Sequence, residues 1–264
     1  MRILGIESSS LVASVAVVSD DILIAEYTVN LKKTHSQTLL PMIDEIMTML
    51  EMEPSSMDAI AVSGGPGSFT GLRIGSATAK GLGLALQKPL IHVPTIDAMA
   101  YNLYGTSALI CPIMDARRNQ VYTGLYHCAK NLDTLLNPCA MDMKELMERL
   151  NERQESVIFL GDGVPVYRTI IEEGMTAPYE FAPAHMNRQR AGAVAALGSI
   201  YLQENREISA ADFEPDYLRR PQAERERAER ERAERERAER EGAERERAER
   251  EGAEREGAER EGAG

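Results

Sequence analysis

A glycine-rich segment is the part of the sequence whose residue types best fit a chemical role. It reads SGGPGSFTGLRIG over residues 63–75 and follows an apolar run, residues 58–63, that predicts a buried strand. A strand, a glycine loop and a helix start in this order bring free backbone N–H groups and the positive end of the helix dipole together, which favours an anion. The candidate nucleotide or phosphate loop comprises Gly64, Gly65, Gly67, Ser68 and Thr70.

The loop does not match either generic phosphate-binding motif. None of its glycines is followed, at the distance that a P-loop requires, by a Gly-Lys pair. The stretch from Gly65 to Gly67 leads to Thr70 where the dinucleotide fingerprint requires a glycine. A structural turn is therefore the main alternative to a phosphate site.

Other residue types that could carry catalysis are too scattered to form a motif. The four histidines never stand four residues apart, and neither H-E-x-x-H nor G-x-S-x-G occurs. Three cysteines without a C-x-x-C pair indicate neither a disulfide framework nor a cysteine metal site. The sequence therefore predicts no catalytic residue and no metal site.

Small residues recur every four positions in the helix predicted after the glycine loop. Gly71, Gly75, Ala79 and Gly83 form one stripe along it. Each glycine inside a helix costs about 0.8–1 kcal/mol relative to alanine, so the stripe indicates close packing against another element. The spacing leaves open whether that element belongs to this chain or to a partner.

The remaining pattern predicts two lobes of similar order. Three strand-like runs within residues 2–29 precede a helix that starts at His35, a strand over 58–63, the helix after the glycine loop, a strand near 90–93 and a helix near 95–104. Residues 107–204 repeat this order loosely, with strands at 108–115, 120–127 and 156–161, a short third strand near 132–136, and helices near 141–153, from 164 and over 189–204. Three strands followed by helix, strand, helix and strand is the order of a ribonuclease-H-like lobe. We therefore predict an N-terminal lobe over 1–104 and a C-terminal lobe over 105–221, with the last helix packing on the N-terminal lobe.

Composition sets the C-terminal tail apart and excludes several classes of protein. Residues 222–264 repeat Ala-Glu-Arg with a period of five, which turns 140° per repeat around a helix and gives no apolar side. We predict a solvated low-complexity tail. The formal net charge of −12 argues against autonomous nucleic-acid binding, and no apolar run approaches the ~20 residues of a membrane span. The sequence predicts a cytoplasmic protein that does not enter a membrane.

Five segments together resemble the bacterial TsaB (YeaZ) family. They are IESSSLVASVAV (6–17), HSQTLLP (35–41), GGPGSFTGLRIG (64–75) followed by AKGL, DARRNQVYTGLY (115–126) and GDGVPVY (161–167). The resemblance covers residues 1 to about 220 and leaves the tail outside. It implies an α/β protein with the actin-like ATPase fold (the Hsp70, actin and sugar-kinase superfamily), built from two ribonuclease-H-like lobes.

The resemblance also implies a non-catalytic role. TsaB proteins are paralogues of TsaD, which binds a metal through H-x-x-x-H and transfers threonylcarbamoyl to N6 of adenosine 37 in tRNA. The equivalent positions here are Thr95 and Met99, which suit a divalent ion poorly. The expected protein is an accessory subunit of the tRNA threonylcarbamoyladenosine machinery that binds and orders a TsaD-like partner.

The family further implies where partners bind. The helix from His35 and the helix after Gly67 would form a helical bundle with the TsaD-like subunit, and a TsaE-like ATPase would join at that junction. The interface residues carried over are His35, Leu39, Leu40, Ile43, Gly71, Leu72, Gly75 and Ala79. A homodimer of the isolated chain would use the same surface, tRNA would be met only through the complex, and no cofactor is expected beyond weak nucleotide binding at the junction.

Two rival functions remain open at this point. A small actin-like kinase or ATPase would use Glu7 and the Gly64–Gly67 loop to hold nucleotide. A glycoprotease, a label sometimes attached to this family, would need a nucleophile–base pair or metal ligands that the sequence lacks. Stabilisation of the isolated chain by nucleotide would favour the first rival, because a ligand bound only by the folded state raises its stability.

Overall fold

The computed structural model describes residues 1–31 and 34–218, which belong to one compact unit, Met1–Leu218. The first half contains β1 (Arg2–Glu7), β2 (Val12–Ser19), β3 (Ile22–Asn30), α1 (His35–Met49), the 3-10 turn η1 (Pro54–Ser56), β4 (Ala59–Gly65), α2 (Phe69–Leu86), β5 (Leu90–Pro94) and α3 (Thr95–Tyr101). The second half contains β6 (Thr106–Asp115), β7 (Gln120–Cys128), β8 (Asp133–Asp142), α4 (Met143–Arg153), β9 (Val157–Leu160), α5 (Val164–Gly174), β10 (Tyr179–Phe181), α6 (Ala191–Gln203) and β11 (Glu207–Ile208).

The two sheets repeat one strand arrangement. The first has the order β11-β5-β4-β1-β2-β3, and the second has the order β10-β9-β6-β7-β8. In each sheet three consecutive strands pair antiparallel, and the first of them also pairs with a parallel strand that follows a helical connection. The prediction of two ribonuclease-H-like lobes in an α/β, actin-like arrangement is confirmed.

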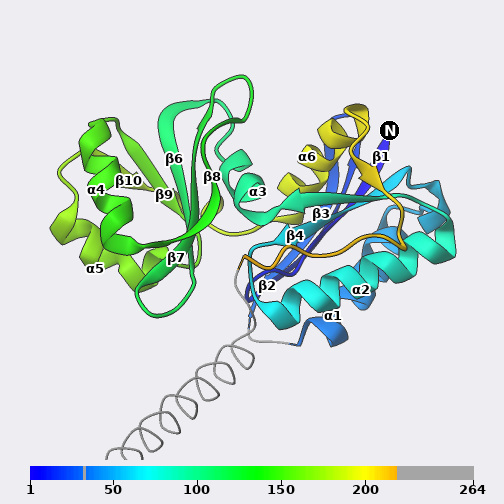
Figure 1. Ribbon diagram of the computed structural model, residues 1–264. Helices are drawn as coiled ribbons and strands as arrows, with labels where there is room; N and C mark the ends of the chain where they lie inside the picture. The colour runs from blue at the N-terminus through cyan, green and yellow to red at the C-terminus, as the bar shows by residue number, and fades with distance from the viewer. Residues whose placement is uncertain (32–33, 219–264) are drawn as a thin grey trace, which may run out of the picture. The chain divides into compact units, whose positions relative to one another are not determined.

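Helices lie against the faces of the two sheets (Figure 1), and apolar side chains hold them there. One cluster lies between α1, α2 and the first sheet, and another lies between that sheet and α6. A third joins α4 and α5 to the second sheet, and a fourth surrounds α3 on the other face of the second sheet. The pairs α1–α2 and α4–α5 therefore cover equivalent faces of the two lobes.

Several elements differ from the sequence-based prediction. The strand expected near 132–136 extends over Asp133–Asp142, as β8. The helix predicted from about 141 therefore starts later, as α4, because the Asp142 side chain accepts a hydrogen bond from the Lys144 N–H and caps it. The short strands β10 and β11 were not predicted, since two or three residues give no readable periodicity.

The last described segment returns to the first lobe. Helix α6 packs on β1, β2 and β4, and β11 then pairs antiparallel with β5. Residues 209–218, here named the C-terminal strap, continue along α2 (Figure 1). The boundary predicted between residues 104 and 105 stays a prediction.

Predictions for the repeat tail lie outside the described residues, as does the predicted end of the second lobe at residue 221. Among the helices within 1–31 and 34–218, none is long and apolar enough to cross a membrane.

Candidate functional site

Helix α1 presents one apolar face to the first sheet and a mixed face to the outside. Its buried residues are Leu39, Met42, Ile43, Ile46 and Met47, at the spacing of one helix face. The ring Nε2 of His35, at the first position, lies 2.8 Å from the Ser10 carbonyl oxygen. Two predicted interface residues, Leu39 and Ile43, are thus core residues of this chain, whereas Leu40 keeps 53 % of its surface exposed.

The small-residue stripe of α2 faces the chain's own first lobe. A Cβ added to Gly71 would lie 2.1 Å from the Ser8 carbonyl oxygen, and one added to Gly75 would lie 2.2 Å from Ser8 Oγ. At Gly83 the nearest atom would be Ala210 Cβ, in the strap, at 2.9 Å. The packing element that the sequence left open therefore belongs to this chain, and these glycines let α2 approach it closely.

The predicted interface residues consequently divide into two groups. Leu72 and Ala79 are buried, as are Gly71 and Gly75, so these residues lie beneath the outer surface of α2. The exposed apolar side chains on the outer face are Leu40 on α1, Met49 at its end, and Leu84 on α2. The sequence-based interface did not include Met49 or Leu84. Both stand on the polar side of their helices, where a large apolar residue can indicate a binding surface. The interface assignment stays a prediction.

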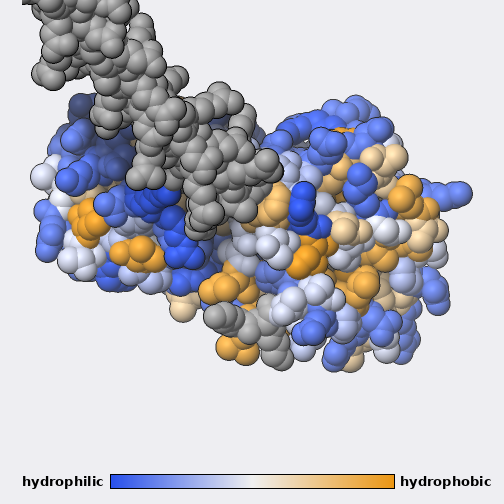
Figure 2. Space-filling view, turned by 60° about the horizontal axis from the view of Figure 1, so that its bottom comes forward, coloured by the Kyte–Doolittle hydropathy of each residue, from blue (hydrophilic) through white to orange (hydrophobic). Residues whose placement is uncertain are grey.

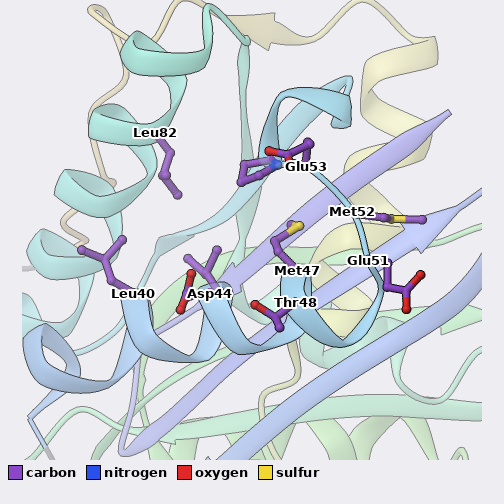
Figure 3. Close-up of a pocket in the computed structure, with 10 residues that line it drawn as sticks. Leu40, Asp44, Met47, Thr48, Glu51, Met52, Glu53 and Leu82 are labelled. Atoms are coloured by element: carbon purple, nitrogen blue, oxygen red, sulfur yellow. The ribbon is translucent and has the colours of Figure 1, made fainter.

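Of these three side chains, Leu40 lines a pocket of about 640 Å³ between α1, α2 and η1. Figure 3 shows Leu40 and Met47 reaching toward it from α1, and Leu82 from α2. Its wall continues through the segment after α1, which carries Glu51, Met52, Glu53 and Pro54. In Figure 2 hydrophobic residues are interspersed with polar ones over this side of the molecule.

The glycine loop is filled by atoms of the same chain. The Ser68 N–H donates to the Ser9 carbonyl oxygen at 2.6 Å, and a Cβ on Gly67 would lie 2.4 Å from that oxygen. The Ser68 hydroxyl caps α2 by accepting from the Gly71 N–H. Gly65 has a φ of 121°, in the region that glycine tolerates. The structure thus places Gly64, Gly65, Gly67, Ser68 and Thr70 together at the start of α2, in a loop that a turn explains.

The strap closes the other side of this loop. The Asp216 N–H donates to the Gly64 carbonyl oxygen at 2.6 Å, and the Asp216 carboxylate lies 3.4 Å from His92 Nε2. Tyr217 stacks against Phe69, the first residue of α2, with 4.9 Å between ring centroids. A Cβ on Gly65 would lie 2.2 Å from the Asp216 carbonyl oxygen, so the strap touches the loop backbone itself.

More of the strap is anchored along α2. The Lys80 ammonium donates to the carbonyl oxygens of Ala211 and Phe213, at 2.9 and 3.1 Å. Phe213 is 1 % exposed and belongs to the cluster beneath α1 and α2. The strap is therefore a structural part of the first lobe.

Glu7, at the end of β1, is a fully buried carboxyl group. One oxygen accepts from the Ser9 N–H and the Ser9 hydroxyl, each at 2.6 Å, and the other has no partner among the described residues. Burial raises the pKa of Glu7 from 4.5 to about 7, although the Ser9 hydrogen bonds oppose this, and the nearby Asp162 carboxylate adds to the rise. Near neutral pH this carboxyl group is shared between its charged and neutral forms.

Thr95 and Met99, the residues at the TsaD ligand positions, stand one turn apart on α3. Both are buried, and Met99 Cε lies close to Gly161 of the second lobe. The buried Thr95 hydroxyl has no hydrogen-bond partner in residues 1–31 and 34–218. The same residues contain no group of three or more His, Cys, Asp or Glu side chains placed to hold a metal. Neither Thr95 nor Met99 offers a strong ligand for a borderline metal, so the predicted absence of a metal site stays a prediction.

Known proteins similar to this chain point to one family. A family model described as TsaD, tRNA N6-adenosine threonylcarbamoyltransferase, matches residues 23–227. The tRNA threonylcarbamoyladenosine biosynthesis protein TsaB of Bacillus subtilis is 35 % identical over 228 residues, which span 85 % of this chain and 96 % of that protein. The Escherichia coli protein of the same name is 36 % identical over 134 residues, 50 % of this chain and 57 % of that protein.

A solved structure agrees with the fold. A Pseudomonas aeruginosa protein described as similar to the peptidase YeaZ superimposes with a TM-score of 0.72 at 24 % identity. The match covers 83 % of this chain and 99 % of that one. At this identity the likeness concerns the fold alone.

Proposed function

Because the chain belongs to the TsaB (YeaZ) family, we propose that it takes part in biosynthesis of N6-threonylcarbamoyladenosine in tRNA as a non-catalytic subunit. In this role it binds and orders a TsaD-like catalytic paralogue, through the outer face of α1 and α2. We name this face the docking face and define it by Leu40, Met49, Leu84 and the lining of the pocket between the helices.

The main support for the proposal is that the docking face exposes large apolar side chains, which are unfavourable on a surface in contact with water alone. Leu40, Met49 and Leu84 expose 53 %, 78 % and 60 % of their surfaces on two adjacent helices. Large exposed apolar side chains, with a pocket beside Leu40, are typical of a surface that binds another protein. Beneath them the buried stripe fixes α2 to the first sheet, so the face is presented on a rigid support.

A non-catalytic role is supported by the residues at the TsaD ligand positions. A threonine and a methionine replace two imidazoles, and Met99 fills space between the lobes. A peptidase activity receives no support from the described residues. Within residues 1–31 and 34–218 no group of side chains is placed to hold a metal, and no serine or cysteine side chain is paired with a histidine side chain.

The rival reading, a nucleotide-dependent enzyme, receives little support from the glycine loop. Its N–H group at Ser68 is taken by Ser9, and its backbone is in contact with Asp216, so an incoming phosphate would have to displace both. We propose that any nucleotide binds weakly, at the junction where a TsaE-like ATPase would join, and that tRNA is met only through the complex. A homodimer of the isolated chain would occupy the docking face in place of the partner.

Reconstitution with the TsaD-like paralogue of the same genome tests this function. The chain should form a stable heterodimer with it and should be required for threonylcarbamoylation of tRNA, while alone it should neither modify tRNA nor gain thermal stability from ATP. Full modification activity in its absence, or nucleotide-dependent turnover by the chain alone, would refute the proposal. Leu40→Asp with Leu84→Asp should strongly weaken complex formation without unfolding the chain, whereas mutations on the exposed side of α5 should leave complex formation unchanged.

A further inference from the structure

The pocket in the docking face combines an apolar floor with an acidic rim. Met47 is buried at its base, and Leu40 and Leu82 flank it from the two helices. The rim carries three exposed carboxylates, those of Asp44, Glu51 and Glu53 (Figure 3). A volume of about 640 Å³ is ample for a large side chain.

These three carboxylates lack charged partners of their own. Within residues 1–31 and 34–218 no lysine or arginine forms an ion pair with Asp44, Glu51 or Glu53. Helix α1 ends at Met49, beside the pocket, and its last turn contains no basic residue. The negative end of its dipole therefore adds to the field of the carboxylates. Lys80, the nearby cation on α2, is held by the strap carbonyls.

We propose that this pocket receives a large apolar side chain of the TsaD-like partner that is flanked by lysine or arginine. The apolar floor would bury the anchor, and the unpaired carboxylates would select a basic neighbourhood around it. This inference rests on the proposed function, and it adds the chemistry by which the docking face distinguishes its partner from other apolar surfaces.

Other occupants fit the pocket less well. The chain's own segment 222–264 consists of Ala, Glu, Arg and Gly after Gln222, so it offers basic residues but no large apolar anchor. A second copy docking pocket to pocket would bring the same carboxylates against each other, which costs free energy. A basic, apolar element of another protein satisfies both the floor and the rim.

Charge reversal tests the rim. Asp44→Lys with Glu53→Lys should raise the dissociation constant for the TsaD-like paralogue about tenfold at 0.1 M salt. This loss of affinity should be smaller at 0.5 M salt, because salt screens the repulsion between like charges. The matched control is Glu148→Lys with Glu152→Lys, which changes net charge equally at exposed positions on α4. It should bind as the unaltered chain does.

Filling the pocket tests the floor. Thr48 is exposed and lines the pocket, so Thr48→Trp would occupy the anchor's place without entering the core, and binding should fall by more than tenfold. Equal melting temperatures of all variants would show that folding is unaffected.

Each result has one meaning. If the unaltered chain binds the paralogue and the pocket variants bind equally well, the pocket inference fails while the proposed function stands. If the unaltered chain does not bind the paralogue at all, the proposed function itself fails. If sedimentation shows that the pocket variants lose only self-association, the occupant is a second copy and the inference is overturned.

Discussion

The two lobes share one strand arrangement but differ in the surfaces of the helix pairs that cover them. Helices α4 and α5 each carry an ion pair four residues apart, Arg149 with Glu145 and Arg168 with Glu172. In the described residues α1 and α2 have no such pair. They expose Leu40, Met49 and Leu84, and a pocket lies beside Leu40. Helix α5 also exposes apolar side chains, those of Val166 and Ile170.

The lobes also differ in what lies at the ends of their first strands. Glu7 at the end of β1 is fully buried, whereas Asp115 at the end of β6 receives a hydrogen bond from the Tyr167 hydroxyl at 3.1 Å and lies 3.5 Å from the exposed Arg117 guanidinium. Within the described residues, the strap lies on the first lobe alone. The two lobes thus share one strand arrangement, and the first differs from the second by a fully buried carboxyl group and by the strap along α2.

The largest effect should come from removing the strap. Ending the chain after Ile208 would expose the site of Phe213 and release Lys80, and loss of one buried phenylalanine costs about 3–5 kcal/mol. Urea unfolding should show at least this loss in the free energy of unfolding. Ending the chain after Leu218 should leave stability and partner binding nearly unchanged. Equal stability of the two truncated chains would show that the strap does not hold the first lobe together.

The next largest effect concerns Glu7. The pKa of Glu7 is about 7 in the folded state, whereas its ordinary value is 4.5. Ionisation of Glu7 therefore lowers the free energy of unfolding progressively from pH 4.5 to 7, and the loss stays constant above pH 7. Glu7→Gln removes the charge, so above pH 7 it should stabilise the protein by about 3 kcal/mol, and below pH 4.5 by nothing. Asp115→Asn removes a charge that Arg117 and the Tyr167 hydroxyl stabilise, so it should not stabilise the protein at any pH. Unfolding free energies measured from pH 4 to 8 would decide, and a pH-independent difference would contradict the burial argument.

Paired mutations on equivalent helices would sharpen the contrast between the surfaces. Leu40→Asp with Leu84→Asp should raise the dissociation constant for the TsaD-like paralogue about a hundredfold, which corresponds to a loss of about 2.7 kcal/mol in binding free energy. Val166→Asp with Ile170→Asp should change it less than threefold. Because these side chains are exposed, neither pair should alter stability by more than about 1 kcal/mol. Similar losses of affinity from both pairs, measured by titration calorimetry, would mean that the partner does not distinguish the lobes.

The smallest effect should come from the ion pairs of the second lobe. Arg149→Ala and Glu172→Ala each remove one exposed pair, worth about 0.3–0.5 kcal/mol, and neither should affect partner binding. The loss should vanish in high salt, since screening weakens exposed pairs. A stability loss above 2 kcal/mol in thermal unfolding would show that these pairs do more than keep the surface solvated.

Much of the fold could be predicted because its main elements are long and periodic. The strands of the first lobe and the faces of α1 and α2 follow directly from apolar spacing. The length of β8 could not be predicted, because Asn137 and Pro138 interrupt its pattern while the strand continues. Boundaries set by a single cap, such as the start of α4 after Asp142, also escaped prediction.

The candidate site was harder to predict, because spacing cannot say which neighbour a residue meets. The stripe at Gly71 and Gly75 signalled close packing, yet the atoms in contact with it belong to Ser8, which is distant in sequence. The strap gave almost no signal, since its apolar residues, among them Phe213 and Tyr217, follow neither a helical nor a strand period. The exposed Leu84 was readable only once the buried face of α2 was known.

The path of the strap has a consequence for how the chain folds as it is synthesised. The second sheet is built entirely from residues 106–181, one continuous stretch, whereas the first needs α6, β11 and the strap from the end of the described chain. The hydrogen bond from Lys80 to the Ala211 carbonyl oxygen joins residues 131 positions apart, so it cannot form until Ala211 has been synthesised. Contacts so far apart in sequence form slowly. The first lobe, although translated first, is therefore completed after the second, and its apolar inner face stays open to chaperones until the strap has left the ribosome.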